Sequence, residues 1–440
     1  MIFTLGLIVI APFYVWRYWG TSQIRASLGE RLGRLAPAFN QAKPGCIWIH
    51  AVSVGETLAV SGLVQKLQTR FPNRQIFISH VTPTGRAAGE SGLQGVAGRF
   101  YAPLDWNFAV RRVLDALKPA VLIIAETEIW PNLIRAARQR GTAVVFVNAR
   151  LSDRSLKGYC LARPFMRRVL ESVDLVCAQT EEDAKRFCAL GVRPERVLAA
   201  GNLKFDFRAP APGEFSICLD KALRQAGRSP VVIAASTMPD EEPLVLKAWR
   251  QVRIEHPRTL LILAPRHPAR FNAVAELLQA QGQSLVRRTS LEANEREITA
   301  GLASADILLL DTIGELAGMF RLADLVFMGG TLVPTGGHNI LEPAYWAKPV
   351  LFGSHMENFR EISRLFLKEG AAIQSGNESE LADQMLQLLQ DEQRRKSLGE
   401  SARRVFARES GATDRIVENL SVFLVENESM QASAAGGIPR

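Results

Sequence analysis

Short apolar runs alternate with helical patterns along most of the chain, and this alternation restricts the possible folds more than any other feature. In the first half the candidate strands are residues 46–52, 75–81, 120–126, 142–148 and 174–179. In the second half they are residues 231–236, 259–265, 306–311, 324–330 and 349–353. Nearly continuous apolar strands separated by helices are typical of parallel sheets covered on both faces. We therefore expect an α/β fold of two doubly wound, Rossmann-like units.

A stretch rich in proline and glycine interrupts the alternation between the two halves. It reads DFRAPAPGEFS over residues 206–216, and we interpret it as the interdomain linker. The expected domains are residues 21–208 and 217–426, followed by a disordered tail at 427–440. Two consecutive doubly wound units would face a cleft, with ligands bound at the carboxyl ends of the strands.

The first twenty residues differ from the rest of the chain. Residues 1–16 carry no charge, and as a helix they would span about 24 Å, just short of a bilayer core. Aromatic residues follow, and then come arginines opposed by one acidic residue, Glu30: Arg17, Arg25, Arg31 and Arg34. We predict a single N-terminal membrane anchor at 1–20, spanning the bilayer or lying in its interface, with the rest of the chain in the cytoplasm. A cleaved signal peptide does not fit, because the segment has neither a basic start nor a small-residue cleavage site. A buried first helix remains as the alternative.

Composition excludes several classes of protein. With 47% hydrophobic and 22% charged residues the chain is not disordered or fibrous. Five cysteines without a CxxC pair indicate a reducing compartment. The net charge of +9 fits an anionic substrate, a phospholipid surface or a nucleic acid. Basic pairs such as Arg287-Arg288 are scattered, so we interpret them as solvated faces, and no motif for reading nucleic acid is present.

Several familiar catalytic motifs are missing. There is no GxGxxG after the first strand of either half, no GxxxxGK[ST], no GxSxG and no HExxH. Asp-x-Asp pairs and clusters of His and Cys at metal spacing are also missing. We therefore expect no metal and no cofactor. The functional groups should be carboxylates, basic side chains and glycine-rich turns at strand ends.

Three candidate acidic residues and one lysine follow strands of the first half. Glu56 closes the string HAVSVGE (50–56), where it would act as a general base or merely complement a helix dipole. Glu126 and Glu128 lie in ETEIWPN (126–132), where solvated turn residues are the alternative. Lys204 in GNLKFD (201–206) would neutralise charge on a phosphate or a carboxylate.

Basic and glycine-rich turns follow strands of the second half. Arg266 and His267 in APRHP (264–268) form a candidate anion clamp. The string GGTLVPTGGHNILEPA (329–344) begins with Gly329 and Gly330, which would let the backbone approach a ligand closely. A helix starting near Asn339 would offer amides to a phosphate, and Glu342 would accept hydrogen bonds from a ribose. A further glycine turn, DTIGELAGMF (311–320), suits a nucleoside or phosphate.

Together these strings resemble the lipopolysaccharide 3-deoxy-D-manno-octulosonic acid (Kdo) transferases, which are glycosyltransferases of the GT-B fold. The similarity covers nearly the whole chain in the family's order. The matching strings are HAVSVGE, TPTG (82–85), ETEIWPN, NAR (148–150), GNLKFD, PRHP, GEL (314–316) and GGHNILEP. The chain departs from the family at Met238 and Asp240, where a His and a Gly are common, and it keeps the following pair Glu241-Glu242.

The resemblance implies an inverting, metal-independent transfer of Kdo from CMP-Kdo to the lipid A precursor, a tetra-acylated, bis-phosphorylated disaccharide. The acceptor would bind the N-terminal domain, and the donor the C-terminal domain, at the cytoplasmic face of the bacterial inner membrane. Glu56 would be the proton acceptor, with Glu128 and Lys204 supporting the transition state. The residues implied to hold CMP are Pro265, Arg266, Ile313, Gly314, Glu315, Asn339, Ile340, Leu341 and Glu342. Possible additional site residues are Glu126, His267, Gly329 and Gly330.

Two other functions are compatible with the expected architecture. GT-B-like nucleotide-sugar epimerases share two such domains but lack a membrane anchor, and HAVSVGE argues against this class. A membrane-tethered binding protein of two lobes would leave Glu56, Glu126 and Glu128 without a role.

Overall fold

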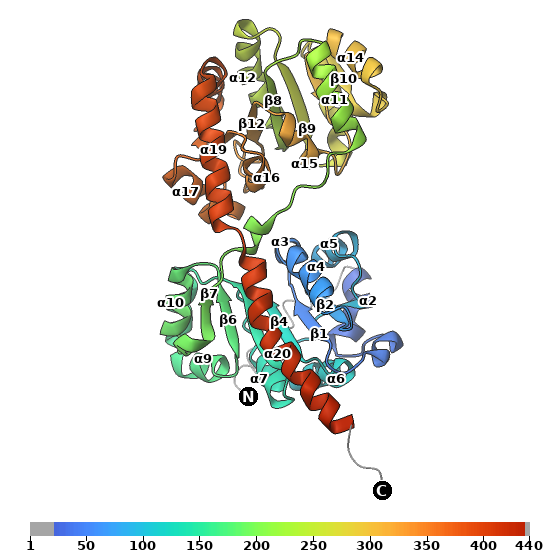
Figure 1. Ribbon diagram of the computed structural model, residues 1–440, viewed down its shortest axis with the longest axis vertical. Coiled ribbons are helices and arrows are strands. Elements are labelled where there is room, and N and C mark those ends of the chain that lie inside the picture. Colours follow the sequence, from blue (N-terminus) through green and yellow to red (C-terminus); the bar gives the residue numbers. More distant parts are fainter. Residues whose placement is uncertain (1–21, 436–440) are drawn as a thin grey trace. The chain divides into compact units, whose positions relative to one another are not determined.

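The computed structural model describes the backbone of residues 22–435, which form two compact units. Of these, residues 22–206 and 410–435 belong to the first unit, and Phe207–Glu409 form the second (Figure 1). The anchor expected at residues 1–20 lies outside the described residues. Within the described part of the chain, no helix combines the length and the apolar character needed to cross a membrane.

The first unit is built on a seven-stranded parallel sheet in the order β3-β2-β1-β4-β5-β6-β7. Its strands are β1 (Ile47–His50), β2 (Ile76–His80), β3 (Gly98–Tyr101), β4 (Val121–Ala125), β5 (Ala143–Ala149), β6 (Leu175–Ala178) and β7 (Val197–Ala199). Every strand pair is parallel, and β1 and β4 are in register from Ile47↔Val121 to His50↔Ile124. All carboxyl ends of the strands therefore lie at one edge of the sheet.

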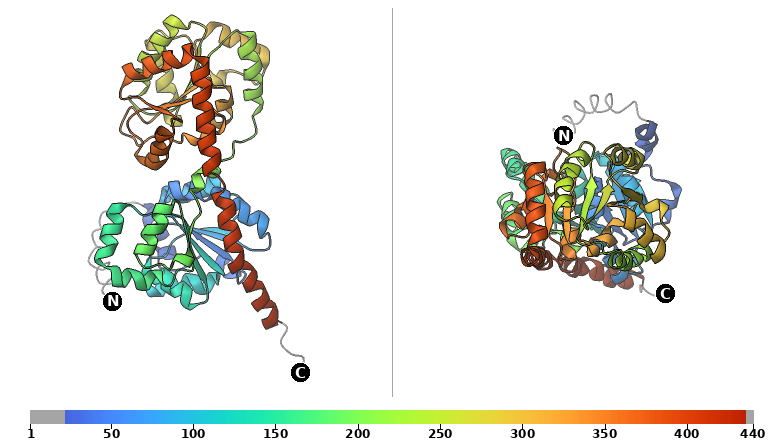
Figure 2. Two further views of the ribbon diagram at one scale, coloured as in Figure 1. Left: turned by 60° about the vertical axis from the view of Figure 1, so that its left-hand side comes forward. Right: turned by 90° about the horizontal axis from the view of Figure 1, so that it is seen from above.

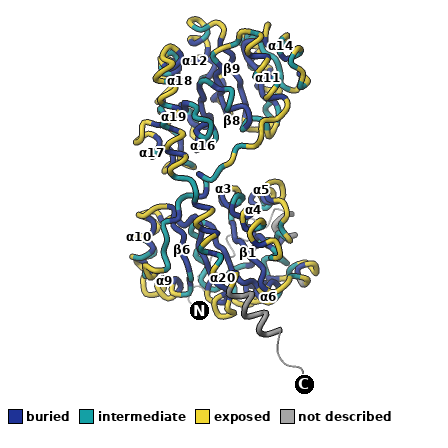
Figure 3. Tube along the Cα trace, viewed as in Figure 1, coloured by how far each residue is buried: buried dark blue, intermediate teal, exposed yellow. Residues whose placement is uncertain are grey.

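Helices cover both faces of the first sheet. They are α2 (Ser22–Arg31), α3 (Val54–Ala59), α4 (Ser61–Arg70), α5 (Pro83–Gly92), α6 (Asn107–Leu117), α7 (Pro131–Gln139), α8 (Asp153–Leu161), α9 (Arg163–Leu170), α10 (Glu181–Ala189) and α20 (Ala412–Ala435). Alternate residues of β1 enter two separate cores, because successive side chains of a strand point to opposite faces. Ile47 and Ile49 pack with Leu63 of α4, whereas Trp48 packs with Val113 of α6. Figure 3 shows the buried strands between exposed helix surfaces.

The second unit repeats this plan with a seven-stranded parallel sheet in the order β10-β11-β9-β8-β12-β13-β14. Its strands are β8 (Val231–Thr237), β9 (Leu260–Pro265), β10 (Leu285–Arg287), β11 (Ile307–Leu309), β12 (Leu325–Met328), β13 (Val350–Phe352) and β14 (Ile373–Gln374). Its helices are α11 (Glu214–Gln225), α12 (Glu242–Glu255), α13 (Phe271–Ala280), α14 (Glu295–Ser304), α15 (Leu316–Met319), α16 (Leu341–Tyr345), α17 (Arg360–Lys368), α18 (Glu378–Gln390) and α19 (Glu392–Glu409). Side chains of α12, α13 and α18 share one core with β8 and β9. The prediction of two doubly wound parallel units is confirmed.

The strands that the sequence did not predict are those at the sheet edges. They are β3 and β7 of the first sheet and β10 and β14 of the second. Their side chains are mostly half-buried or exposed, whereas β1, β4 and β12 are buried throughout. An edge strand has one neighbouring strand and therefore carries a weaker apolar signal.

The C-terminal boundary predicted for the second domain, residue 426, is wrong. The chain leaves the second unit after Glu409 and returns to the first, where α20 packs on the core through Ile416, Leu420 and Leu424 (Figures 1 and 2). Asp206 accepts hydrogen bonds from the backbone amides of Gly411 and Thr413, which fixes the start of α20. The backbone of α20 continues to Ala435, past residue 427, where we expected a disordered tail to begin.

Replacing Leu420 tests the attachment of α20 to the first unit. Leu420 is fully buried, so Leu420→Ala should destabilise the first unit by about 2–5 kcal/mol. Hydrogen exchange should then accelerate in peptides of β1 and β4. Val422→Ala is the matched control, because Val422 lies on the same helix and is exposed. Faster exchange confined to residues 217–409 would contradict the assignment of α20 to the first unit.

Candidate active-site residues of the two units

Glu56 lies in the first turn of α3, just beyond the carboxyl end of β1. Its Oε2 accepts a hydrogen bond from the backbone amide of Val52 at 2.8 Å, and its Oε1 accepts one from Ser53 Oγ at 2.8 Å. The residue is buried, with 7% of its surface exposed. Both oxygens are thus held by the loop that connects β1 to α3, and the carboxylate has a fixed orientation.

The neighbouring TPTG string supports this loop. Thr82 caps α5 by accepting a hydrogen bond from the Gly85 amide at 3.0 Å, and its hydroxyl donates to the Val52 carbonyl at 3.2 Å. A Cβ at Gly85 would lie 3.0 Å from that carbonyl oxygen, so a larger residue would push α5 away. The glycine therefore allows the two strand-end turns to pack closely.

Burial and neighbouring charge change the acidity of Glu56. Burial raises the pKa of Glu56 to about 7, the hydrogen bonds from Val52 and Ser53 oppose the shift, and the charges of Glu126 and Glu128 add to it. The structure thus brings together the three carboxylates that the sequence singled out on this unit. A carboxyl group with a pKa near neutrality can both accept and release a proton under cellular conditions.

Glu126 and Glu128 are held by specific partners rather than simply solvated. Glu126 has a left-handed backbone (φ 53°), and its Oε2 forms an ion pair with Arg150 at 3.0 Å. Glu128 Oε2 accepts a hydrogen bond from Trp130 Nε1 at 2.8 Å. The Trp130 ring in turn lies edge-to-face with His50, the last residue of β1, at 4.7 Å between ring centroids.

Lys204 follows β7 and lies at the same sheet edge as Glu56. Its turn is fixed by hydrogen bonds of 3.0 Å from the Lys204 amide to Asn202 Oδ1 and from the Leu203 amide to Asn148 Oδ1. Asn148 belongs to the NAR string and has a left-handed backbone (φ 54°). The NAR and GNLKFD strings, far apart in sequence, are therefore in direct contact.

In the second unit, the turn after β9 carries Arg266 and His267, both exposed, next to the buried Pro265. Burial lowers the pKa of His338 to about 4, and the charges of Arg266 and His267 contribute. Burial also raises the pKa of Glu342 to about 7, whereas a hydrogen bond from Asn339 and the charge of Arg266 oppose that shift. The PRHP and GGHNILEP strings thus form one cluster, as the sequence predicts.

Two glycines of the glycine-rich string lie close to other protein segments. A Cβ at Gly329 would lie 2.8 Å from the Ser236 carbonyl oxygen, and one at Gly337 would lie 2.6 Å from Met356 Sδ. A larger residue at either position would therefore disturb the packing of these segments. The helix expected near Asn339 is short, Leu341–Tyr345, and Asn339 Oδ1 itself accepts the Leu341 amide at 3.1 Å.

Arg287 and Arg288, which we expected on a solvated face, instead bind the acidic residues of the DTIGEL segment (311–316). Arg288 Nε donates to Glu315 Oε2 and Arg288 Nη2 donates to Glu315 Oε1, each at 2.9 Å. Arg287 Nε binds Asp311 Oδ2 at 2.7 Å. Ile313 remains 65% exposed, and Gly314 has a φ of 91°. The interpretation of Arg287-Arg288 was wrong because Arg287 ends β10 and Arg288 directly follows it, and the pattern did not reveal this edge strand.

The structure explains one departure from the family. Asp240 has a left-handed backbone with a φ of 67°. Glycine adopts this conformation without strain, and aspartate tolerates it better than most residues. Asp240 therefore replaces the usual glycine with the turn geometry retained.

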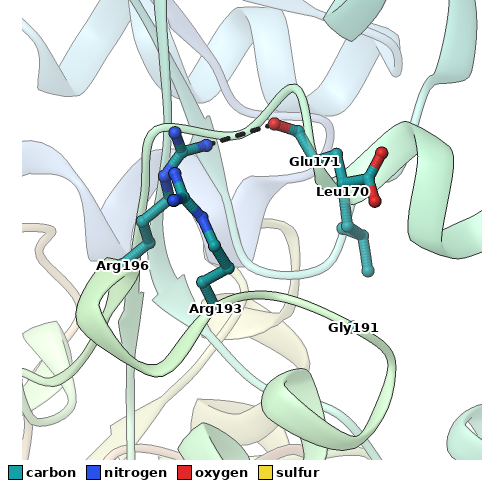
Figure 4. Close-up of a pocket in the computed structure, with 5 residues that line it drawn as sticks. All are labelled: Leu170, Glu171, Gly191, Arg193 and Arg196. Carbon is teal, nitrogen blue, oxygen red and sulfur yellow. Dashed lines mark hydrogen bonds between the residues drawn. The ribbon is translucent and has the colours of Figure 1, made fainter.

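A pocket of about 260 Å³ in the first unit does not contain these residues. It is lined by Leu170, Glu171, Gly191, Arg193 and Arg196, with Arg196 Nη1 bound to the Glu171 carbonyl at 3.1 Å (Figure 4). These residues precede β6 and β7, so the pocket lies at the sheet edge opposite to Glu56. Among the residues with described side chains, no group of three or more His, Cys, Asp or Glu is arranged to hold a metal ion.

The two parallel sheets form a GT-B-like fold. A UDP-GlcNAc 2-epimerase from Neisseria meningitidis has the same fold, with a TM-score of 0.53 over 85% of this chain and 99% of that chain at 12% identity. Residues 26–207 match the family described as 3-Deoxy-D-manno-octulosonic-acid transferase (kdotransferase).

Sequence similarity then identifies the family to which this chain belongs. The chain is 33% identical to a 3-deoxy-D-manno-octulosonic acid transferase of Haemophilus influenzae over 92% of both chains. It is 34% identical to one of Bordetella pertussis, over 96% of this chain and 99% of the relative. The chain belongs to the 3-deoxy-D-manno-octulosonic acid transferase family of glycosyltransferases, which confirms the resemblance found in its motifs.

The raised pKa of Glu56 is directly testable. In protein labelled with 13C at glutamate carboxyl carbons, two resonances, those of Glu56 and Glu342, should titrate near pH 7, and one of them should disappear in Glu56→Gln. Glu126→Gln removes a negative charge, so it should move the Glu56 titration to lower pH. Glu181→Gln, an exposed first-turn residue of α10, should leave it in place. An unchanged titration in Glu126→Gln would contradict the coupling.

Proposed function

We propose that this protein transfers Kdo from CMP-Kdo to the tetra-acylated, bis-phosphorylated lipid A precursor, with inversion and without a metal ion. Membership of the Kdo transferase family supports the reaction. The observation that carries the assignment of the base is the buried Glu56 carboxyl group, fixed by Val52 and Ser53, with a pKa of about 7.

In the proposed reaction an acceptor hydroxyl attacks the anomeric carbon of Kdo and transfers its proton to Glu56. The bond from that carbon to the phosphate oxygen breaks, and the electron pair leaves with CMP. A carboxylate with a pKa near 7 suits this task, since its basicity matches the working pH. A single base on the acceptor side requires no covalent intermediate, which is why we propose inversion.

The remaining carboxylates and Lys204 would act around this base. Glu126 and Glu128 keep the pKa of Glu56 high through their charges. We assign Glu128 and Lys204 to the transition state, in which positive charge develops on the sugar and negative charge on the phosphate.

We propose that CMP binds the second unit at the cluster of Arg266, His338 and Glu342. A guanidinium can bind two phosphate oxygens at once, and the exposed Arg266 is available for this contact. The remaining proposed contacts come from the turns of this sheet edge: Pro265, His267, Ile313, Gly314, Glu315, Gly329, Gly330, Asn339, Ile340 and Leu341. An epimerase is not favoured, because the similarity to the epimerase at 12% identity extends only to the fold.

Substituting Glu56 separates chemistry from donor binding. Glu56→Gln should lower the transfer rate by about 10²–10⁴-fold, because the isosteric amide cannot accept the proton. The affinity for CMP should stay unchanged. Glu181→Gln is the control, because Glu181 also lies in the first turn of a helix, α10, and its charge would only complement the dipole of that helix. This variant should transfer Kdo at the wild-type rate. Wild-type transfer by Glu56→Gln would contradict the assignment of the base.

We further propose that residues 1–20 anchor the protein to the inner membrane, with both units on the cytoplasmic side. The uncharged run at 1–16 and the arginines after it support this. Helix α2 follows directly, and it is fastened to the first unit by the Glu30–Arg86 ion pair at 2.9 Å and by Arg31 Nη2 donating to the Val81 carbonyl at 2.6 Å. An anchor would therefore tether the unit that carries Glu56.

Deleting residues 1–20 tests the anchor. The shortened protein should no longer float with vesicles of anionic phospholipid, and its transfer to lipid-embedded acceptor should fall. Its CMP affinity should match that of the full chain, which shows that both units are intact. Equal vesicle binding by the two proteins would contradict the proposal.

A further inference from the structure

Two consecutive glutamates after β8, Glu241 and Glu242, are completely buried. A buried carboxylate is unfavourable unless charged or hydrogen-bonding partners compensate for its lost hydration. The proposed reaction uses neither residue, so their partners show what each one does.

The hydrogen-bond partners of Glu242 are the last residue of β8, Thr237, and Arg270, which follows β9. Arg270 donates to both of its oxygens, at 2.6 Å and 2.8 Å. Thr237 Oγ1 donates to its Oε1 at 2.9 Å. None of the hydrogen bonds described for this residue reaches the glycine-rich segment 329–344.

Glu241 forms no ion pair with another described residue, and the hydrogen bonds described for its carboxyl group all come from backbone amides. Its Oε2 accepts from Gly330 at 2.6 Å and from Met238 at 3.1 Å. Its Oε1 accepts from Thr331 at 2.9 Å and from Leu332 at 3.0 Å. Burial raises the pKa of Glu241, and the hydrogen bonds from these four amides oppose that shift. Three consecutive amides of the turn after β12 thus converge on one internal carboxylate.

The contact continues from Gly330 to the proposed CMP-binding segment. The Gly330 carbonyl accepts hydrogen bonds from the Gly337 amide at 2.8 Å and from Thr335 Oγ1 at 3.0 Å. Gly337 is followed directly by His338 and Asn339. Both sides of the Gly330 backbone are therefore fixed, one by Glu241 and one by the segment that carries the proposed donor contacts.

We propose that Glu241 is a positioning residue for donor binding: its carboxylate holds the amides of Gly330, Thr331 and Leu332 and so fixes the backbone from Gly329 to Asn339. The proposal rests on the donor site assigned above. Without this acceptor, buried amides of the turn are left unpaired, and the turn must rearrange to hydrate them. The following backbone, which carries His338 and Asn339, would then shift relative to Arg266.

Glu241→Gln is the informative variant, because a glutamine keeps the size but replaces one acceptor oxygen by a donor. We expect the Kd for CMP and the KM for CMP-Kdo to rise about tenfold or more. The KM for the lipid acceptor and the proton-transfer chemistry at Glu56 should be unaffected. Glu242→Gln is the matched control: it also removes a buried carboxylate and should lower the Tm, with the Kd for CMP within about threefold of wild type.

The outcomes distinguish this inference from the donor site on which it rests. If Arg266→Ala weakens CMP binding and Glu241→Gln does not, the positioning role is overturned and the donor site stands. If neither variant weakens CMP binding, the donor site itself is overturned. An equal loss of CMP affinity in Glu242→Gln would also overturn the inference, since general destabilisation would then explain the effect.

Hydrogen exchange keeps the proposal testable if Glu241→Gln does not fold. In the wild-type protein the amides of Gly330, Thr331 and Leu332 should exchange as slowly as those of β12. In Glu241→Asp, which keeps the charge but shortens the side chain, their exchange should accelerate together with a smaller loss of CMP affinity. Fast exchange of these amides in the wild-type protein would overturn the proposal.

Discussion

Parallel strand pairing is the constraint on which the rest of the structure depends. In each unit all strands run in one direction, so each of them delivers the turn that follows it to the same sheet edge. Glu56, Glu128 and Lys204 follow three different strands of the first sheet and share one edge for this reason. Arg266, Glu315 and Asn339 reach one edge of the second sheet in the same way. Residues separated by more than a hundred positions, such as Glu56 and Lys204, thereby come to lie at one sheet edge.

Both units fix a buried glutamate with amides of the strand-end turns. Glu56 is held by the Val52 amide and the Ser53 hydroxyl, and Glu241 by four backbone amides. The two glutamates differ in the number of hydrogen-bond donors that hold them. Burial raises the pKa of Glu56 to about 7, the charges of its two acidic neighbours add to the shift, and the group suits proton transfer. Burial also raises the pKa of Glu241, but four amide donors oppose the shift, and the group suits a structural role beside the segment proposed to bind the donor.

The apolar pattern predicted the buried central strands and, through them, the sheet edges that carry the motifs. It did not reveal the edge strands, because residues such as those of β7 and β10 are half-buried and alternate weakly. Arg288 was missed for the same reason, since it follows β10 and its partner Glu315 is distant in sequence. The return of α20 to the first unit depends on Asp206 and on packing of Leu420, which no local pattern encodes. The resemblance to Kdo transferases supplied the roles of Glu56 and Lys204, which spacing left open.

The most direct test is to mix the purified full chain with CMP-Kdo and the tetra-acylated, bis-phosphorylated lipid A precursor, and to analyse the lipid by mass spectrometry. The account predicts that the lipid gains the mass of at least one Kdo residue while an equal amount of CMP is released. CMP release without a gain of lipid mass, or recovery of both substrates unchanged, would contradict it.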